Sequence, residues 1–122
     1  MSDRQAQLYD YWSAEGGADG GLSITAFDPL AVWGCIGFLH ILEYDKGRGD
    51  FFYRVYGESA AGAARAAMHR RWVSEQPGNA GAAFHAHYSD VMASRRPWLG
   101  EVFTVDRLDV APYWYRIVLP LA

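Results

Sequence analysis

The fold is decided by residues 84–122, FHAHYSDVMASRRPWLGEVFTVDRLDVAPYWYRIVLPLA. Apolar and aromatic side chains first recur there at helical spacing, and Pro97 ends the pattern because proline cannot continue a helix. Two segments with alternating side chains follow, residues 99–107 and 112–122, which is typical of strands. The sequence therefore predicts a helix over residues 79–96 followed by a two-stranded hairpin.

A second hairpin is predicted upstream of the long helix. Residues 36–45 alternate in character, residues 50–57 return, and the Lys-Gly-Arg-Gly segment between them has the composition of a turn. Both faces of this hairpin are partly apolar, so we expect both to be covered. The Ala-rich residues 59–68 predict one or two short helices. The order strand–strand–helices–strand–strand predicts an α+β fold, a small antiparallel sheet with helices over one face.

The chain begins with a short predicted helix. Ser2 and Gln5 form a capping-box pattern, and Gly16-Gly17 ends the helix. Residues 22–27 alternate briefly and suggest a further short strand, which Asp28-Pro29 ends. We therefore divide the chain into an N-terminal capping helix with a Gly-rich link, residues 1–21, and a main domain, residues 22–122.

Composition limits the class of protein. Hydrophobic residues make up 51% of the 122 residues and charged residues 20%, which indicates one globular domain. Aromatic residues, at 16%, are enough for a core and for one further aromatic pocket or surface. The net charge of −3 argues against a nucleic-acid partner.

The expected location is the cytoplasm. Cys35 is the single cysteine, which excludes an internal disulfide and fits a reducing compartment. The N-terminal residues lack the apolar segment of a signal peptide. No apolar run approaches the roughly 20 residues that a membrane span needs, so no membrane partner is expected.

Several motifs, spaced over nearly the whole chain, resemble those of one superfamily. They are Leu8-Tyr9-Asp10-Tyr11-Trp12, Asp28-Pro29-Leu30, Phe52-Tyr53-Arg54-Val55-Tyr56-Gly57, Arg96-Pro97 and Tyr115-Arg116-Ile117-Val118-Leu119-Pro120-Leu121. In this order the motifs resemble the PAS superfamily of sensor domains, and most closely the stand-alone alphaproteobacterial group known as PAS_5. The resemblance implies a sensory, ligand-binding or protein-interaction domain in bacterial signal transduction, without catalysis of its own.

The resemblance also implies a sheet of five antiparallel strands with the fifth strand in the centre. Four strands are evident in this sequence, so we expect the fifth to be missing or supplied elsewhere and the domain to be incomplete at its C-terminus. A ligand pocket is then expected between the inner face of the sheet and the long helix. By strand parity and helical spacing its lining residues are Tyr53, Val55, Phe84, His87, Tyr88, Val91, Tyr115 and Ile117.

The opposite strand parity assigns Tyr56, Trp114 and Val118 to the outer face of the sheet. These side chains would form an exposed apolar patch, and the leading helix carries Leu8, Tyr11 and Trp12 on one side. We therefore predict a homodimer in which the leading helix contributes to the interface.

Each residue that could take part in chemistry also has a structural interpretation. His87 lies on the apolar stripe of the long helix, where some PAS sensors bind haem iron, yet a core histidine hydrogen-bonded to a neighbour is the simpler interpretation and we predict no haem. The alternative class is a small α+β enzyme or carrier with a cone-like pocket, in which His87 or His40 acts as a base. Arg54 and Arg116 are expected to stack on aromatic rings or pair with acids across the sheet. The sequence contains no phosphate loop, zinc motif or nucleophile elbow.

Overall fold

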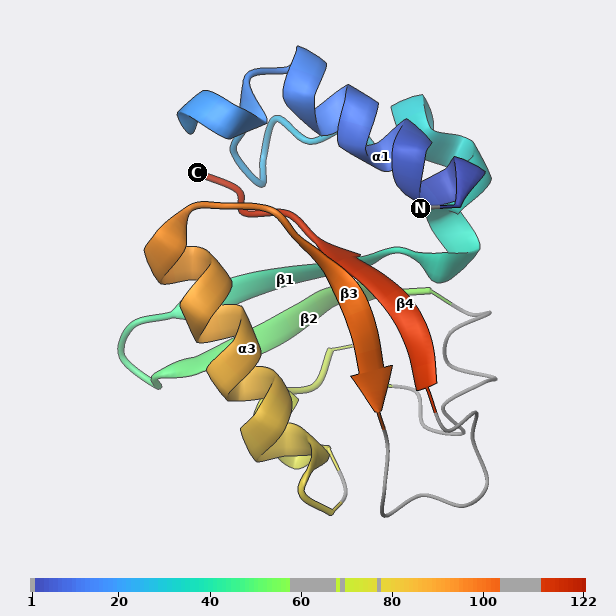
Figure 1. Cartoon of the computed structure of the whole chain (residues 1–122). Coiled ribbons are helices and arrows are strands. Elements are labelled where there is room, and N and C mark those ends of the chain that lie inside the picture. Colours follow the sequence, from blue (N-terminus) through green and yellow to red (C-terminus); the bar gives the residue numbers. More distant parts are fainter. Residues whose placement is uncertain (1, 58–67, 69, 77, 104–112) are drawn as a thin grey trace.

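The computed structural model describes residues 2–57, 68, 70–76, 78–103 and 113–122, and Figure 1 shows their arrangement. In chain order the elements are α1 (Asp3–Ala14), η1 (Gly17–Asp19), η2 (Pro29–Phe38), β1 (His40–Asp45), β2 (Asp50–Tyr56), η3 (Val73–Glu75), α3 (Ala80–Ser94), β3 (Trp98–Phe103) and β4 (Tyr113–Val118), where η denotes a 3₁₀ helix. The α+β class is confirmed.

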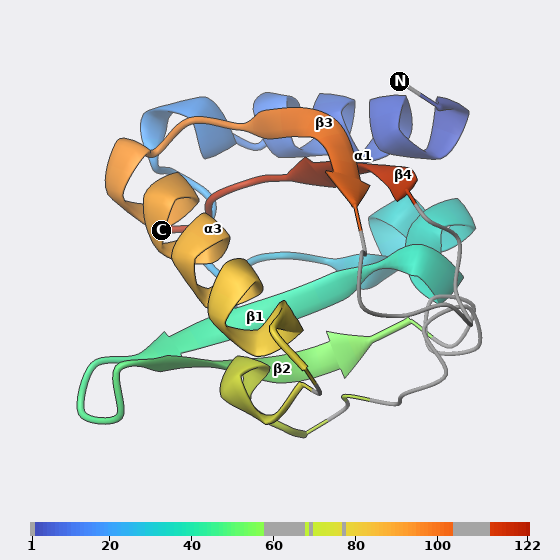
Figure 2. The ribbon, with the colours of Figure 1, turned by 60° about the horizontal axis from the view of Figure 1, so that its bottom comes forward.

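The strands form two separate antiparallel hairpins. β1 pairs with β2 and β3 pairs with β4, and each pair is a two-stranded sheet. The single sheet that we expected is therefore not seen in the part of the chain that the structure describes. α3 lies alongside both hairpins, and α1 lies on the opposite side of them, above β4 and η2 (Figures 1 and 2).

The β1–β2 hairpin separates two apolar clusters, so both of its faces are covered as predicted. The cluster on the α3 side contains Phe51, Tyr53, Met68, Val73 and Tyr88. The cluster on the α1 side contains Val32, Cys35 and Leu39, with Ile41 packed against it. Leu42 and Tyr44 pack on the α3 side, so side chains along β1 alternate between the clusters.

A β-bulge reverses the predicted parity at the end of β2. Ile41 pairs with Val55 and Leu42 pairs with Tyr53, which leaves Arg54 as the extra residue. Tyr56 therefore lies on the same side as Tyr53, with their ring centroids 5.2 Å apart. Val55 shares the other face with its partner Ile41. Val55 was expected on the same face of the strand as Tyr53, and Tyr56 on the opposite face; the bulge reverses both, because alternation along the sequence does not reveal a bulge.

The parity of β4 is also the reverse of the prediction. Arg116 and Val118 point to the α3 side, where Val118 packs against the apolar cluster and Arg116 contacts α3. Ile117 pairs with Leu99 on the other face, and Leu99 is exposed. Strand alternation assigns two faces but does not say which one is inner when both carry apolar residues. The assignment of Ile117 to the inner face and of Val118 to the outer face of the strand was therefore wrong.

The long helix is confirmed almost at its predicted limits. α3 runs over Ala80–Ser94, and Arg95 ends it in a left-handed conformation with φ 58°. The leading helix is confirmed as well, with both hydrogen bonds of the Ser2–Gln5 capping box present. Gly16, at φ 83°, adopts the left-handed conformation that glycine accepts most easily.

The segment before β1 differs from the prediction. Residues 36–38 belong to η2 and not to a strand. η2 begins at Pro29, and the Asp28 carboxylate accepts a hydrogen bond from the backbone amide of Leu30 at 3.0 Å. Residues 22–27 form a turn closed by Phe27 N–H donating to Ser23 O at 3.0 Å. The backbone groups of this apolar segment thus form hydrogen bonds within a turn and a 3₁₀ helix, and not with a partner strand. The short helices predicted over residues 59–68 lie, except for Met68, outside the described residues.

The leading helix is joined to the rest of the same chain. Trp12 is buried, with 1% of its surface exposed, and its indole N–H donates to Pro120 O at 2.8 Å. Leu8 and Tyr11 pack against the cluster of η2. Arg4 donates to Gly34 O at 3.2 Å, which adds a polar contact between α1 and η2. Residues 3–14 therefore cover their own domain.

Candidate functional site

The most unusual group of side chains lies where β4 faces α3. The Arg116 guanidinium lies 4.5 Å from the ring centre of Phe84 and 5.1 Å from that of Tyr88. Its Nη1 donates to Tyr88 Oη at 3.2 Å, and its Nη2 donates to His87 Nδ1 at 2.5 Å. One arginine thus contacts three side chains of a single helix. We call Arg116, Phe84, His87 and Tyr88 the Arg116 cluster.

Helical spacing and the register of β4 explain how the Arg116 cluster forms. Phe84, His87 and Tyr88 are at positions i, i+3 and i+4, so they share one face of α3. Trp98, the residue opposite Val118 in β3, meets His87 edge to face with ring centroids 4.3 Å apart. Gly100 lies opposite Arg116, and a Cβ there would be 2.9 Å from Trp98 Cζ2. Glycine at this position therefore allows the indole ring to cover the cluster.

The Arg116 cluster contains a positive charge that no described carboxylate neutralises. Among the residues that the structure describes, the one ion pair is between Arg54 and Glu43, on the β1–β2 hairpin. Arg116 Nε and His87 Nε2 are both buried and have no hydrogen-bond partner. Buried polar nitrogens without a partner are rare in folded proteins, because leaving one unpaired costs about 1–3 kcal/mol.

The two unpaired nitrogens are both donors. A guanidinium in a protein stays protonated and has no acceptor, so His87 Nδ1 must offer its lone pair to Arg116. The remaining ring proton of a neutral His87 is then on Nε2. Burial, and next the charge of Arg116, lower the pKa of His87, while Asp90 acts in the opposite direction. The Arg116 cluster therefore presents two buried N–H groups and one net positive charge.

A second histidine lies near the same charge. His40 stacks on Tyr56 with ring centroids 4.0 Å apart, and its Nδ1 accepts a hydrogen bond from the Gly57 amide at 3.2 Å. Burial, followed by the charge of Arg116, lowers the pKa of His40 to about 4, although a backbone contact at Leu39 raises it. His40 is thus neutral near pH 7, and the single lone pair of its ring nitrogens is engaged.

Tyr53 links the hairpin to this polar interior. Its hydroxyl accepts a hydrogen bond from Gln76 Nε2 at 2.7 Å, and 1% of its surface is exposed. Burial, with smaller contributions from Tyr88 and Tyr56, raises the pKa of Tyr53, while Arg116 lowers it slightly. Tyr53 therefore remains a neutral hydroxyl that can donate as well as accept.

The contacts of His87 do not fit a haem axial ligand. A histidine that binds iron through Nε2 usually donates its Nδ1 proton to a carbonyl or carboxylate. In this chain Nδ1 faces a cation and must accept, which places the proton on Nε2, where iron would bind. No group of three or more potential metal ligands is found in the described ranges.

The structure brings together only some of the pocket residues predicted from the sequence. Tyr53, Phe84, His87 and Tyr88 gather on the α3 side, and Val91 is buried with 6% of its surface exposed. Val55 and Ile117 lie on the other faces of their strands. The backbone of Tyr115 pairs with Glu101, and its side chain lies outside the described part of the chain. Arg116 was missed as a candidate site residue; the signal was a lone cation between apolar strand residues.

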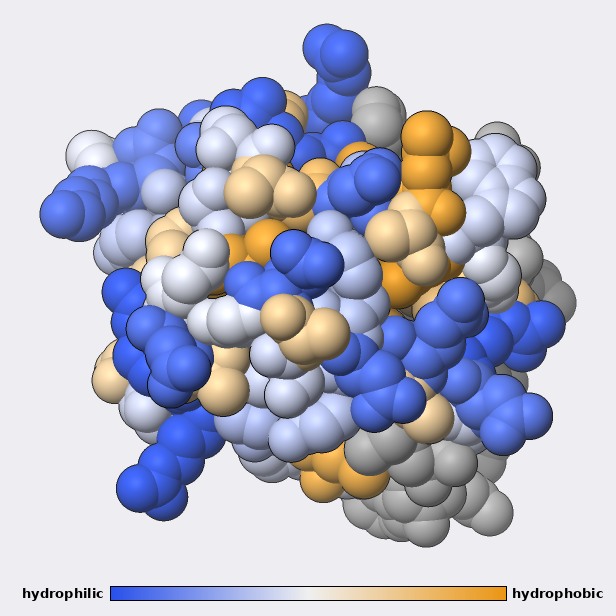
Figure 3. Space-filling view, turned by 90° about the horizontal axis from the view of Figure 1, so that it is seen from above, coloured by the Kyte–Doolittle hydropathy of each residue, from blue (hydrophilic) through white to orange (hydrophobic). Residues whose placement is uncertain are grey.

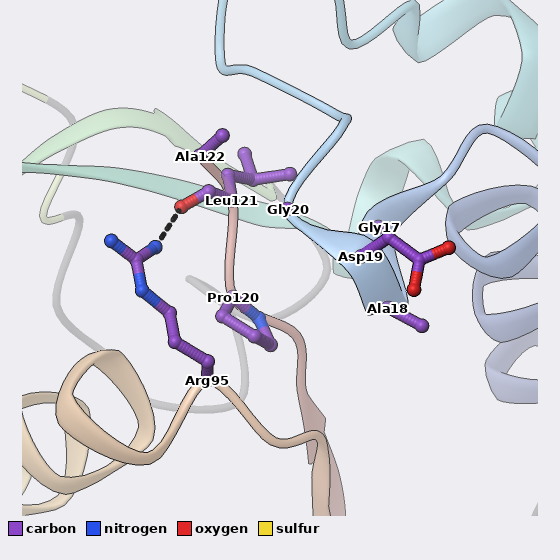
Figure 4. A pocket seen from close by; sticks show the side chains of 8 residues that line it. All are labelled: Gly17, Ala18, Asp19, Gly20, Arg95, Pro120, Leu121 and Ala122. Carbon is purple, nitrogen blue, oxygen red and sulfur yellow. Dashed lines mark hydrogen bonds between the residues drawn. The ribbon is translucent and has the colours of Figure 1, made fainter.

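A shallow groove lies elsewhere, between η1, the end of α3 and the C-terminal segment (Figure 4). It measures about 500 Å³ and is lined by Gly17, Ala18, Asp19, Gly20, Arg95, Pro120, Leu121 and Ala122. Arg95 Nη1 donates to Leu121 O at 3.0 Å, so the guanidinium ties the C-terminal segment to α3. The other lining groups are small or apolar apart from Asp19. The groove therefore presents little chemistry to a ligand.

Comparisons with protein-family models, with curated proteins and with solved structures gave no match to this chain. Within the described residues, no helix combines the length and the apolar character needed to cross a membrane.

Proposed function

We propose that this chain is a PAS-like sensory domain of bacterial signal transduction, which binds a small molecule at the Arg116 cluster and passes the signal to a protein partner without catalysis. The observation that carries the proposal is the pair of buried, unpaired N–H groups, Arg116 Nε and His87 Nε2. Ligand sites are mostly apolar surfaces with a few polar groups, and this cluster combines aromatic rings with two unpaired N–H groups.

Two further observations support the proposal. Four residues that the sequence places in the pocket, Tyr53, Phe84, His87 and Tyr88, gather within one apolar cluster or pack against it. The two hairpins also suit a PAS-like fold, because the fifth strand of that fold is central. The strands in the described part of the chain form two separate two-stranded sheets, an arrangement compatible with a central strand between them.

The proposal is tested by searching for a bound molecule and for ligand-induced stabilisation. Native mass spectrometry of the purified chain, together with thermal unfolding in a chemically mixed library of metabolites, should reveal at least one ligand of 1:1 stoichiometry. The double variant Arg116→Met/His87→Phe should lose that binding, whereas Arg54→Met, a change in an exposed arginine, should keep it. A library with no effect on the parent chain, or an equal effect on the double variant, would refute the proposal.

The alternative of a small enzyme or carrier has no particular support among the described contacts. The base it needs is His87 or His40, and in each ring Nδ1 already accepts a hydrogen bond. A neutral imidazole has one lone pair on its ring nitrogens, so neither side chain offers a free basic nitrogen. We therefore keep the sensory role as the proposal.

The homodimer stays a prediction, although its original basis has changed. Tyr56 and Val118 pack inside, and the side chain of Trp114 lies outside the described residues. The exposed apolar side chains beside α1 are instead Leu30, Trp33 and Phe38 of η2. Figure 3, which views the molecule from above, shows apolar side chains scattered among hydrophilic ones. Sedimentation at tens of micromolar, a rough scale for a weak interface, should show a dimer, and a monomer would contradict it.

A further inference from the structure

We infer that the ligand of the Arg116 cluster is a monocarboxylate attached to a planar apolar body, and that Arg116 Nε–H and His87 Nε2–H donate to its oxygens. This inference rests on the proposed ligand-binding function and names the chemical class of the ligand. Three properties of the cluster favour this class of ligand: its hydrogen-bonding capacity, its charge and its aromatic surfaces.

The hydrogen-bonding capacity requires an acceptor. Arg116 Nε is a donor by its chemistry, and His87 Nε2 is a donor because Nδ1 accepts from Arg116 at 2.5 Å. Both atoms are buried without a partner. A ligand that supplied only donors, such as an amine, would leave both nitrogens unpaired. Oxygens of a carboxylate accept from both, and such charge-assisted bonds are roughly twice as strong as neutral ones.

The charge of the site favours a monoanion. Arg116 contributes one positive charge, and His87 is neutral since burial and Arg116 lower its pKa. The described contacts give Arg116 no carboxylate partner; the one described ion pair, Arg54 with Glu43, lies on another hairpin. A phosphate monoester carries nearly two negative charges at neutral pH. It would leave about one charge uncompensated in a buried place, whereas a monocarboxylate is neutralised.

The surroundings of the two donors are aromatic. Phe84 and Tyr88 stack with ring centroids 6.1 Å apart, and both contact the Arg116 guanidinium. The edge-to-face contact of Trp98 with His87 brings a third aromatic side chain to the cluster. Flat apolar groups pack well against such rings. The body attached to the carboxylate is therefore expected to be an aryl or a similarly flat apolar group.

The test compares probes that differ in one property. Calorimetric titration of the intact chain with phenylacetate should show binding, and 2-phenylethanol, which keeps the ring but loses the charge, should bind at least about tenfold more weakly, since a hydrogen bond to a charged group contributes about 1.5–3 kcal/mol. Inorganic phosphate should not compete. The ¹⁵N resonances of Arg116 Nε and His87 Nε2 should shift during the phenylacetate titration, which locates the probe.

Two variants complete the test. Arg116→Lys keeps the charge but removes the Nε–H, and should weaken phenylacetate binding about tenfold or more. Arg54→Lys is the matched control and should bind as the parent chain does. Equal binding of the acid and the alcohol, competition by phosphate, or unchanged binding by Arg116→Lys would overturn the carboxylate inference.

The outcomes also separate this inference from the proposed function. If the metabolite library stabilises the chain through neutral or cationic molecules while phenylacetate does not bind, the inference fails and the sensory function stands. If neither the library nor phenylacetate acts, and both nitrogens only exchange with water, the two donors are satisfied by solvent and both proposals fail.

Discussion

Each of the two hairpins carries an arginine, and the two arginines lie in opposite environments. Arg54 on β2 pairs with Glu43 across the strands, and more than half of its side-chain surface is exposed. Arg116 on β4 lies against the rings of Phe84 and Tyr88 and has a buried Nε without a partner. Both arginines follow a tyrosine in the sequence. A cation that is paired in solvent does little beyond local stabilisation, whereas a partly buried cation without a described carboxylate partner is available for a ligand.

The different environments of Arg54 and Arg116 indicate where a polar group can be functional. On the β1–β2 hairpin, solvent screens the ion pair, so its energy is small and its loss is tolerated. Beside α3, two aromatic rings contact the half-buried Arg116 guanidinium and its Nε is buried, so the unpaired donor is costly and an added acceptor is favourable. The following predictions test this contrast, beginning with the largest expected effect.

An acidic side chain introduced on the α3 side without a hydrogen-bond donor beside it should prevent folding. Val91 has 6% of its surface exposed, and Val91→Asp would bury a carboxylate among apolar groups at a cost of several kcal/mol. We expect loss of the folded chain, measured by circular dichroism and gel filtration. Val91→Ile is the control and should fold. A folded Val91→Asp chain would show that this interior accepts charge at any position.

Acid should destabilise the chain through His40. The pKa of His40 is lowered to about 4 in the folded chain, and the unfolded value is about 6.5. The unfolded chain therefore binds the proton first, so the stabilisation is complete above pH 6.5 and is lost as the pH falls toward 4. The shift corresponds to about 3 kcal/mol in the free energy of unfolding.

Urea unfolding at several pH values measures this effect. In His40→Asn the side-chain oxygen can take the place of Nδ1 but does not titrate. That variant should lose the part of the pH dependence that His40 contributes. An unchanged dependence between pH 6.5 and pH 4 would contradict the assignment to His40.

Removing the polar groups of the Arg116 cluster should not destabilise the fold. Arg116→Met/His87→Phe replaces the guanidinium and the two N–H groups without a partner by apolar groups of similar size. Such replacements are neutral or stabilising, so we expect the free energy of unfolding to rise by about 1–2 kcal/mol while ligand binding is lost. Urea titration measures the change. A loss of stability greater than about 2 kcal/mol would indicate that Arg116 holds the fold together.

The exposed ion pair should show the smallest effect. Arg54→Ala should lower the free energy of unfolding by less than about 1 kcal/mol, because solvent and salt screen the contact with Glu43. A double-mutant cycle with Glu43→Gln isolates the pair energy, and that energy should decrease further in 0.5 M salt (an approximate test concentration). A coupling of several kcal/mol would remove the contrast between the two hairpins.

Sequence reasoning succeeded where the deciding contacts are local. The Ser2–Gln5 capping box, α3 with its Phe84–Tyr88 face and the β1–β2 hairpin all follow from residues within a few positions of one another. It was wrong on the length of the first strand, where Asp28 and Pro29 start a 3₁₀ helix. It also reversed the faces of β4, because both faces of that strand carry apolar residues.

In the candidate site, too, the features set by local spacing were predicted and those set by tertiary packing were not. The helix residues Phe84, His87 and Tyr88 were predicted because helical spacing alone places them on one face. Arg116 was expected to stack on aromatic rings or to pair with an acid, and it does stack on Phe84 and Tyr88. It was not assigned to the pocket, since an arginine between strand residues is equally typical of a surface ion pair. Its environment depends on the register that places Gly100 and Trp98 opposite Arg116 and Val118, and on His87, which lies 29 positions upstream.

The α+β class, the positions of α1, α3 and the two hairpins, and the side chains that α3 presents together all follow from the sequence alone, because they depend on periodicity and on caps within one segment. Only the tertiary structure decided which face of each hairpin is inner, that the strands form two separate sheets in the described part of the chain, and that Arg116 meets His87. Strand alternation is symmetric between two faces, and a bulge or an opposing helix breaks that symmetry only when the segments pack.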